Sequence, residues 1–110
     1  MSETTAIELT IMSGPEDGAA LNLTRPKQGD SYVIGRREDC DVILPYDSQI
    51  SRQHATLSLK DGVWYVQDLG SRNGTFVGKH KIEGPTPLEP GQMFRVGRTW
   101  MRLKKATGED

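Results

Sequence analysis

The chain has 110 residues, 35% of them hydrophobic, and a net charge of −1, which suits one domain with its own core and gives no broad basic field for nucleic acid or anionic lipid. The single cysteine, Cys40, excludes an internal disulfide and a cysteine-based zinc site. No apolar run approaches the ~20 residues needed to cross a bilayer, and the N-terminus has no basic segment followed by an apolar stretch, so we expect a cytoplasmic protein without membrane contact.

Alternation of apolar and polar residues predicts strands along the whole chain. A period of two places every second side chain on the same face of a strand. Residues 46–61 form the only internal stretch long enough and free enough of Gly and Pro for a good helix, yet Ala55, Leu57 and Leu59 alternate there with polar residues. In chain order, the same period occurs at residues 7–11, 21–23, 55–60, 94–96 and 101–103.

Turn signals separate the predicted strands. The dipeptide Asp61-Gly62 joins residues 54–60 to residues 63–68 and favours a type I′ hairpin, in which both central residues need positive φ. The dipeptide Gly97-Arg98 separates residues 92–96 from residues 99–104 and fits a type II′ turn. The pair Pro90-Gly91 predicts a further turn. The three signals are Asp61-Gly62, Pro90-Gly91 and Gly97-Arg98.

Many short strands with such turns indicate an all-β sandwich or barrel. We expect Trp64 and Trp100 to be core residues of their strands. The polar ends at residues 1–6 and 105–110 are expected to be flexible tails around one domain at residues 7–104.

Three short segments at strand ends, residues 33–37, 51–54 and 68–75, combine glycine or another small residue with cationic, hydroxyl or amide groups. If the three loops share one end of a sandwich, their polar groups suit a phosphate ester, which offers three acceptor oxygens and about −1.5 to −2 charge. Gly70 and Gly74 let the backbone aim N–H groups inward, and Asp68 is expected to point away. The groups brought together would be Arg36, Ser51, Arg52, Ser71, Arg72 and Asn73.

These segments, in this order and spacing, resemble the signature of forkhead-associated (FHA) domains. The resemblance covers roughly residues 7–104 and implies a twisted antiparallel β-sandwich of two sheets, FHA/SMAD-like, with about eleven short strands. It also implies phosphothreonine recognition by loops between strands. We expect no cofactor, no metal and no catalysis. One departure is Gly78, where the family often has Asn. The matching motifs are Gly35-Arg36, Ser51-x-x-His54 and Leu69-Gly70-Ser71-x-Asn73-Gly74-Thr75-x-Val77.

The resemblance also assigns roles by position. Arg36, Ser51, Arg52 and either Ser71 or Arg72 would hold the phosphate, although Arg72 alternatively steers acidic side chains. Asn73 would hold the peptide backbone, because its amide carries both a donor and an acceptor. The residues expected to support the loops structurally are Gly35, His54 and Gly74.

Other functions are weighed against this one. Ser51 and His54 do not form a nucleophile–base pair by spacing alone, and no motif supplies an orienting carboxylate. The acidic neighbours of Cys40 disfavour its thiolate, and His80 has no metal-ligand partners nearby.

The rival functions are a phosphate-independent FHA scaffold or dimerisation module and a nucleic-acid binder. We expect a monomer whose partner is a phosphothreonine-containing protein, and no nucleic acid.

A final hypothesis concerns the N-terminal tail, where Thr4 and Thr5 follow an acidic residue. Either threonine, once phosphorylated, would be a ligand for the pocket of its own domain or of a neighbour, because a tethered ligand has a high effective concentration. The alternative is that the two threonines are incidental.

Overall fold

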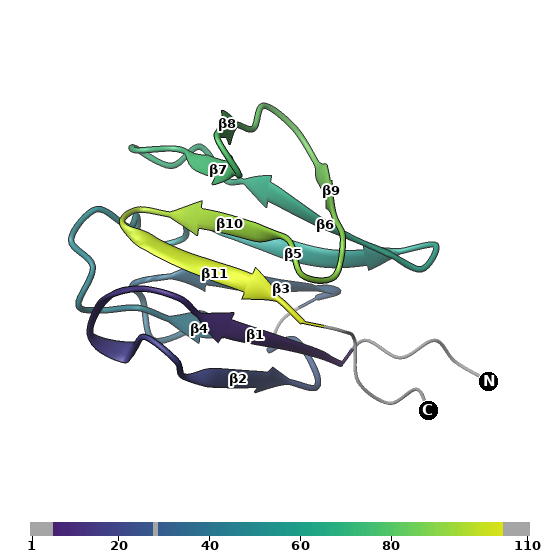
Figure 1. Ribbon diagram of the computed structural model, residues 1–110, viewed down its shortest axis with the longest axis horizontal. Helices are drawn as coiled ribbons and strands as arrows, with labels where there is room; N and C mark the ends of the chain where they lie inside the picture. Colours follow the sequence, from purple (N-terminus) through teal and green to yellow (C-terminus); the bar gives the residue numbers. More distant parts are fainter. Residues whose placement is uncertain (1–5, 28, 105–110) are drawn as a thin grey trace.

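The computed structural model describes residues 6–27 and 29–104. Eleven strands in this part of the chain form two packed sheets, with one turn of 3₁₀-helix, η1, at Gly14–Glu16 (Figure 1). The predicted β-sandwich and its strand number are therefore confirmed. The strands are β1 (Ile7–Ile11), β2 (Ala20–Leu23), β3 (Ser31–Gly35), β4 (Val42–Ile43), β5 (Ala55–Lys60), β6 (Val63–Asp68), β7 (Thr75–Val77), β8 (His80–Lys81), β9 (Thr86–Leu88), β10 (Met93–Val96) and β11 (Thr99–Leu103).

Each sheet has its own strand order. The six-stranded sheet runs β2-β1-β11-β10-β7-β8, and the five-stranded sheet runs β4-β3-β5-β6-β9. The described strands pair antiparallel, as expected of this sandwich, except that β3 and β4 pair in parallel with Ile34 opposite Val42. The short loop between them doubles back beside β3, and the Asp41 carboxylate holds it there by accepting the Val33 N–H at 2.8 Å.

The core lies between the sheets and follows the predicted alternation. On β1, Ile7, Leu9 and Ile11 are buried while the residues between them are not. On β5, Ala55 and Leu57 show the same pattern. Removing such side chains from water is the main favourable contribution to folding, about 25 cal/mol per Å² of apolar surface.

The predicted hairpin turns also form. Asp61 and Gly62 have φ of 52° and 80° between β5 and β6, as a type I′ turn requires. Gly97 has φ of 58° while Arg98 has no positive φ, which fits the type II′ turn between β10 and β11. Gly91 has φ of 89° after Pro90, as in a type II turn.

The two tryptophans occupy different environments. Trp64 is buried and stacks on Tyr32 with ring centroids 6.1 Å apart, as expected of a core residue. Trp100 is only partly buried, and its neighbours on β11, Thr99 and Met101, are the buried ones. The expectation of a core Trp100 is wrong because the period of two that turns Met101 inward turns Trp100 outward.

The connections that matter for the site collect at one end of the sandwich. The end of β3, the start of β5, the β6–β7 connection and the β10–β11 hairpin all lie at the left in Figure 1, while β1 begins and β11 ends at the opposite end. Of the predicted tails, residues 1–5, including Thr4 and Thr5, and residues 105–110 lie outside the described residues. Within the described residues, no helix has the length and apolar character needed to cross a membrane.

Gly35, the last residue of β3, is packed too tightly for any side chain. A Cβ atom there would overlap the carbonyl oxygen of Arg52 and lie 2.9 Å from the Cys40 Sγ. The end of β3 therefore approaches the loop before β5 as closely as only glycine allows.

We predict that Gly35→Ala lowers the free energy of unfolding by about 1–3 kcal/mol, because backbone must move to admit the methyl group. Gly84→Ala is the matched control, since no atom lies within 4 Å of a Cβ there and its φ is not positive; its effect should stay within about 0.5 kcal/mol. Urea denaturation of both variants measures the difference. Equal urea midpoints for the two variants would contradict the close approach of Gly35 to the Arg52 carbonyl.

Candidate functional site

Three loops meet at this end of the sandwich. We name them the β3–β4 loop (residues 36–41), the β4–β5 loop (residues 44–54) and the β6–β7 loop (residues 69–74). They contain the site residues predicted from the sequence, apart from Gly35, which directly precedes the first loop. Their mutual arrangement is set by hydrogen bonds between side chains and backbone.

His54 joins two of these loops from inside. Its side chain is fully buried, and its Nδ1 accepts the backbone N–H of Ser51 at 3.1 Å. The other ring nitrogen, Nε2, lies 2.8 Å from the carbonyl oxygen of Gly74 and therefore carries the proton that it donates. Both ring nitrogens are thus engaged, and the Ser51 hydroxyl is not the group that meets the imidazole, so the pair is not arranged as a nucleophile and its base.

Two further hydrogen bonds cross between the same loops. The Ser51 Oγ accepts the backbone N–H of Arg72 at 3.1 Å. The Asn73 Nδ2 donates to the carbonyl oxygen of Gln49 at 2.8 Å. Within the described residues, the Ser51 hydroxyl proton and the Asn73 Oδ1 have no further partner, so one donor and one acceptor remain for a ligand.

Arg36 is anchored at the base of its side chain. Its backbone N–H lies 3.1 Å from the carbonyl oxygen of Arg52, and its Nε donates to the carbonyl oxygen of Ile50 at 2.5 Å. The residue is exposed, and its terminal Nη groups make no hydrogen bond or ion pair within the described residues. Anchoring at Nε limits the positions that the free end of the guanidinium reaches.

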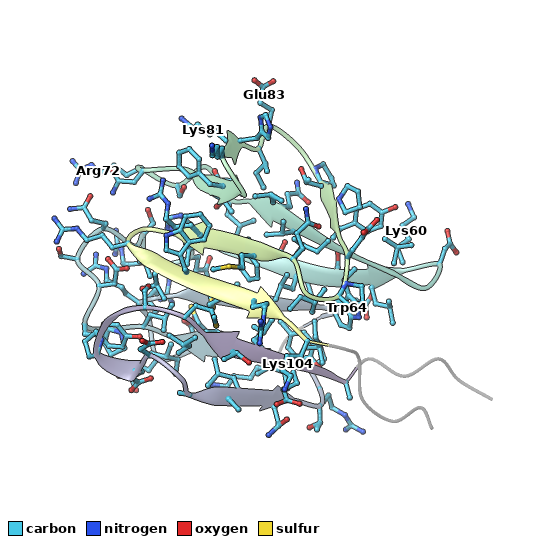
Figure 2. The ribbon with its side chains drawn as sticks, in the orientation of Figure 1. Lys60, Trp64, Arg72, Lys81, Glu83 and Lys104 are labelled. Carbon is cyan, nitrogen blue, oxygen red and sulfur yellow. The ribbon has the colours of Figure 1, made fainter. Side chains whose placement is uncertain are left out.

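Arg52 and Arg72 are exposed and have no carboxylate partner among the described residues, whereas neighbouring Arg37 pairs with Asp39 at 2.9 Å. Figure 2 shows Arg72 projecting from the loop end of the domain, away from the sheets. Together with Arg36, these side chains concentrate uncompensated positive charge on the surface that the three loops form.

Asp68, at the end of β6, organises the β6–β7 loop. From its place in the sequence, Asp68 is expected to point away from the loop. Instead, its carboxylate accepts hydrogen bonds from the Gly70 and Ser71 N–H groups and from the Ser71 and Thr75 hydroxyls. The Ser71 Oγ also accepts the Gly74 N–H at 2.9 Å. Ser71 therefore shapes its own loop, and its contact with phosphate remains a prediction.

The pKa of Asp68 reflects this environment. Burial raises the pKa of the carboxyl, but the hydrogen bonds from Ser71, Thr75 and Gly70 outweigh it, so the pKa lies below the ordinary aspartate value of 3.8. The carboxylate form is therefore the one that the folded loop favours.

Asp47 is a structural residue of the site that the sequence reasoning missed. The buried carboxylate accepts the Arg98 N–H at 2.8 Å and the Thr99 hydroxyl at 2.7 Å, which ties the β4–β5 loop to the β10–β11 hairpin. It also accepts the Gln49 N–H at 2.9 Å. Of these contacts, only the hydrogen bond to Gln49 is local, because an aspartate side chain often accepts the N–H of the residue two positions later. It is therefore the one contact that a sequence pattern could indicate.

The remaining candidates stay outside the polar surface. Cys40 is buried, and burial raises the pKa of its thiol, an effect to which Asp39 and Asp41 add. His80 is exposed on β8. Neither residue contributes to the polar surface of the three loops.

Comparison with known proteins identifies the family. Residues 32–97, more than half of the chain, match the family model described as the FHA domain. The chain belongs to the FHA family. The FHA domain-containing protein FhaB of Mycolicibacterium smegmatis is 38% identical over 99 residues, 90% of this chain and 61% of that protein. Its counterpart FhaB from Mycobacterium tuberculosis is 33% identical over 96 residues, 87% of this chain and 59% of that protein.

Solved structures agree with this fold. The FHA domain of the CT664 protein from Chlamydia trachomatis is 30% identical and superposes with a TM-score of 0.79, covering 94% of this chain and 100% of that one. A structure from a study of phosphothreonine-dependent FHA domain interactions is 27% identical with a TM-score of 0.76 and the same coverage. The FHA domain described here spans about three fifths of the length of the FhaB proteins.

The hydrogen bonds of His54 predict a difference between scaffold and surface. His54→Ala should lower the free energy of unfolding by about 1–3 kcal/mol, because it leaves the buried Gly74 carbonyl and the partly buried Ser51 N–H without their partner. Arg52→Ala, at an exposed position, should change it by no more than about 0.5 kcal/mol. Thermal or urea unfolding of both variants provides the test. A larger loss of stability in Arg52→Ala would reverse these roles.

The lowered pKa of Asp68 predicts a pH dependence. The stabilisation is fully present above the unfolded-state pKa near 3.8 and is lost as pH falls through the lower folded-state pKa. The wild-type FHA domain should therefore lose more stability than Asp68→Asn between about pH 5 and pH 2. Unfolding measured across this range checks the prediction, and parallel pH profiles for the two proteins would refute it.

Proposed function

We propose that this FHA domain binds phosphothreonine peptides through the surface formed by the three loops. The observation that carries the proposal is the convergence there of Arg36, Ser51 and Arg52, each with hydrogen-bond donors unused within the described residues. A phosphate dianion is the ligand that such donors suit, because it presents three acceptor oxygens and a double negative charge.

Each group has a distinct part in the proposed complex. The free Nη groups of Arg36 and the guanidinium of Arg52 donate charge-assisted hydrogen bonds, and the Ser51 hydroxyl donates a further one. The Asn73 Oδ1, left free while Nδ2 bonds the Gln49 carbonyl, accepts an N–H from the peptide backbone. Arg72 takes either a phosphate oxygen or an acidic side chain near the phosphothreonine.

The comparisons support this proposal. A similar solved FHA domain comes from work on phosphothreonine-dependent interactions, and the family model covers the three loops. We further propose that the chain acts as a monomeric, non-enzymatic module in the cytoplasm, whose partner is a protein phosphorylated by a Ser/Thr kinase. The phosphate-independent scaffold is the weaker alternative, because it gives no reason for three arginines that have no carboxylate partner among the described residues to lie beside Ser51 and Asn73.

We predict that a phosphothreonine peptide binds and that its unphosphorylated counterpart does not. Arg36→Ala or Ser51→Ala should weaken binding about tenfold or more, since hydrogen bonds to charged groups contribute roughly 1.5–3 kcal/mol each. Isothermal titration calorimetry with both peptide forms measures these affinities.

Matched controls come from the same end of the domain. Arg98→Ala removes an exposed arginine outside the three loops, and Ser48→Ala removes an exposed serine of the β4–β5 loop. Both should leave the affinity within about twofold of wild type, which corresponds to less than half a kcal/mol. Equal affinity for the two peptide forms would refute the proposed function.

A further inference from the structure

The outer faces of the two sheets differ in chemistry. On the five-stranded sheet, the outward positions of β5 carry Thr56 and Ser58, and those of β6 carry Val63, Tyr65 and Gln67. On the six-stranded sheet, a groove of about 660 Å³ crosses β7, β10 and β11. It is lined by Met12, Phe76, Gly78, Lys79, Met93, Arg95 and Trp100. Its large apolar side chains are half-buried, so part of each remains accessible to a partner.

Arg95 is fixed at the middle of this groove. On the neighbouring strands, Phe76 and Trp100 lie directly opposite it, and its guanidinium carbon is 4.2 Å and 5.7 Å from their ring centroids. Its Nη1 donates to the Gly97 carbonyl at 2.6 Å. The guanidinium is therefore positioned before any partner arrives, and its other N–H groups have no acceptor within the described residues.

The residue that follows β7, Gly78, lines the groove without a side chain. Gly78 has φ of 59°, and no atom lies within 4 Å of where its Cβ would be. Gly78 lines the groove together with Met93, whose carbonyl oxygen accepts the Gly78 N–H at 3.2 Å. The space at Gly78 is therefore open at the edge of the groove.

Positive charge lies within and beside this apolar floor. Lys79, Arg95 and Arg102, which lies opposite Met93, have no ion-pair partner within the described residues. Carboxylates on a partner would complement these cations, and a large apolar side chain would cover the floor. A second copy of the chain fits poorly, because two such faces would bring like charges together.

We propose that this groove docks an extended segment of a partner protein in which acidic residues flank a large apolar side chain. The interaction requires no phosphate and is independent of the three loops. Phe76 in the groove lies only two residues beyond Gly74 in the β6–β7 loop. One partner could therefore engage both the groove and the three loops. Two linked contacts bind more tightly than either contact alone.

The test uses a synthetic peptide in which aspartates flank a Phe-Leu pair, and a counterpart with lysines in place of the aspartates. NMR spectra of the full chain are recorded during each titration. The acidic peptide should shift the Trp100 indole N–H and the methyl groups of Met12 and Met93. Signals of Trp64, which is buried, and of Arg36 should stay unchanged.

Two variants probe the groove with matched controls. Gly78→Asn places a side chain at the edge of the groove, at a φ that asparagine tolerates, while Gly62→Asn introduces the same residue at an open, positive-φ turn elsewhere. Lys79→Glu reverses a charge at the rim, while Lys60→Glu does so at the far end of the domain (Figure 2). Each groove variant should weaken the acidic peptide about tenfold, and the controls should not.

Several results would overturn the inference. These are no saturable shift at Trp100, equal binding of the lysine peptide, or undiminished binding by both groove variants. Shifts at Trp100 that depend on protein concentration without peptide would assign the groove to self-association instead. A phosphothreonine peptide titrated in parallel keeps the two proposals distinct, because it should shift Arg36 and Ser51 whatever the groove does.

Discussion

The polar end of this domain depends on the buried imidazole of His54. By accepting from the Ser51 N–H and donating to the Gly74 carbonyl, one side chain satisfies a backbone donor of the β4–β5 loop and a backbone acceptor beside β7. Buried backbone groups without partners cost about 1–3 kcal/mol each, so the loops are most stable together. Asp68 and Asp47 then fix the loop shapes from within. The terminal Nη groups of Arg36 and the side chain of Arg52 have no partner among the described residues and lie at the surface.

Much of this arrangement could be predicted from the sequence. The period of two located β1, β2, β5, β10 and β11, because one face of each packs on the core. The Asp61-Gly62 and Gly97-Arg98 pairs located hairpins, because their turns need positive φ. The site residues could be chosen together because Arg, Ser and Asn recur at strand ends in an order that resembles a known family. Their separate roles at the phosphate remain predictions.

The rest depends on contacts between distant segments, which local patterns do not encode. Nothing near Asp47 in the sequence indicates that it accepts hydrogen bonds from a hairpin some fifty residues later. The parallel pairing of β3 with β4 likewise depends on how Asp41 folds a loop back. The outward position of Trp100 could have been predicted from its place next to Met101, which points inward. Its contact with the Arg95 guanidinium could not, because that contact depends on the register between β10 and β11.

The most direct test of the phosphate site is a crystal structure of the domain bound to a phosphothreonine peptide. We predict phosphate oxygens within hydrogen-bonding distance of Arg36, Ser51 and Arg52, and the His54 bridge between Ser51 and Gly74 intact. A phosphate bound away from the three loops, or loops that separate at His54 to admit it, would contradict the preformed site described here.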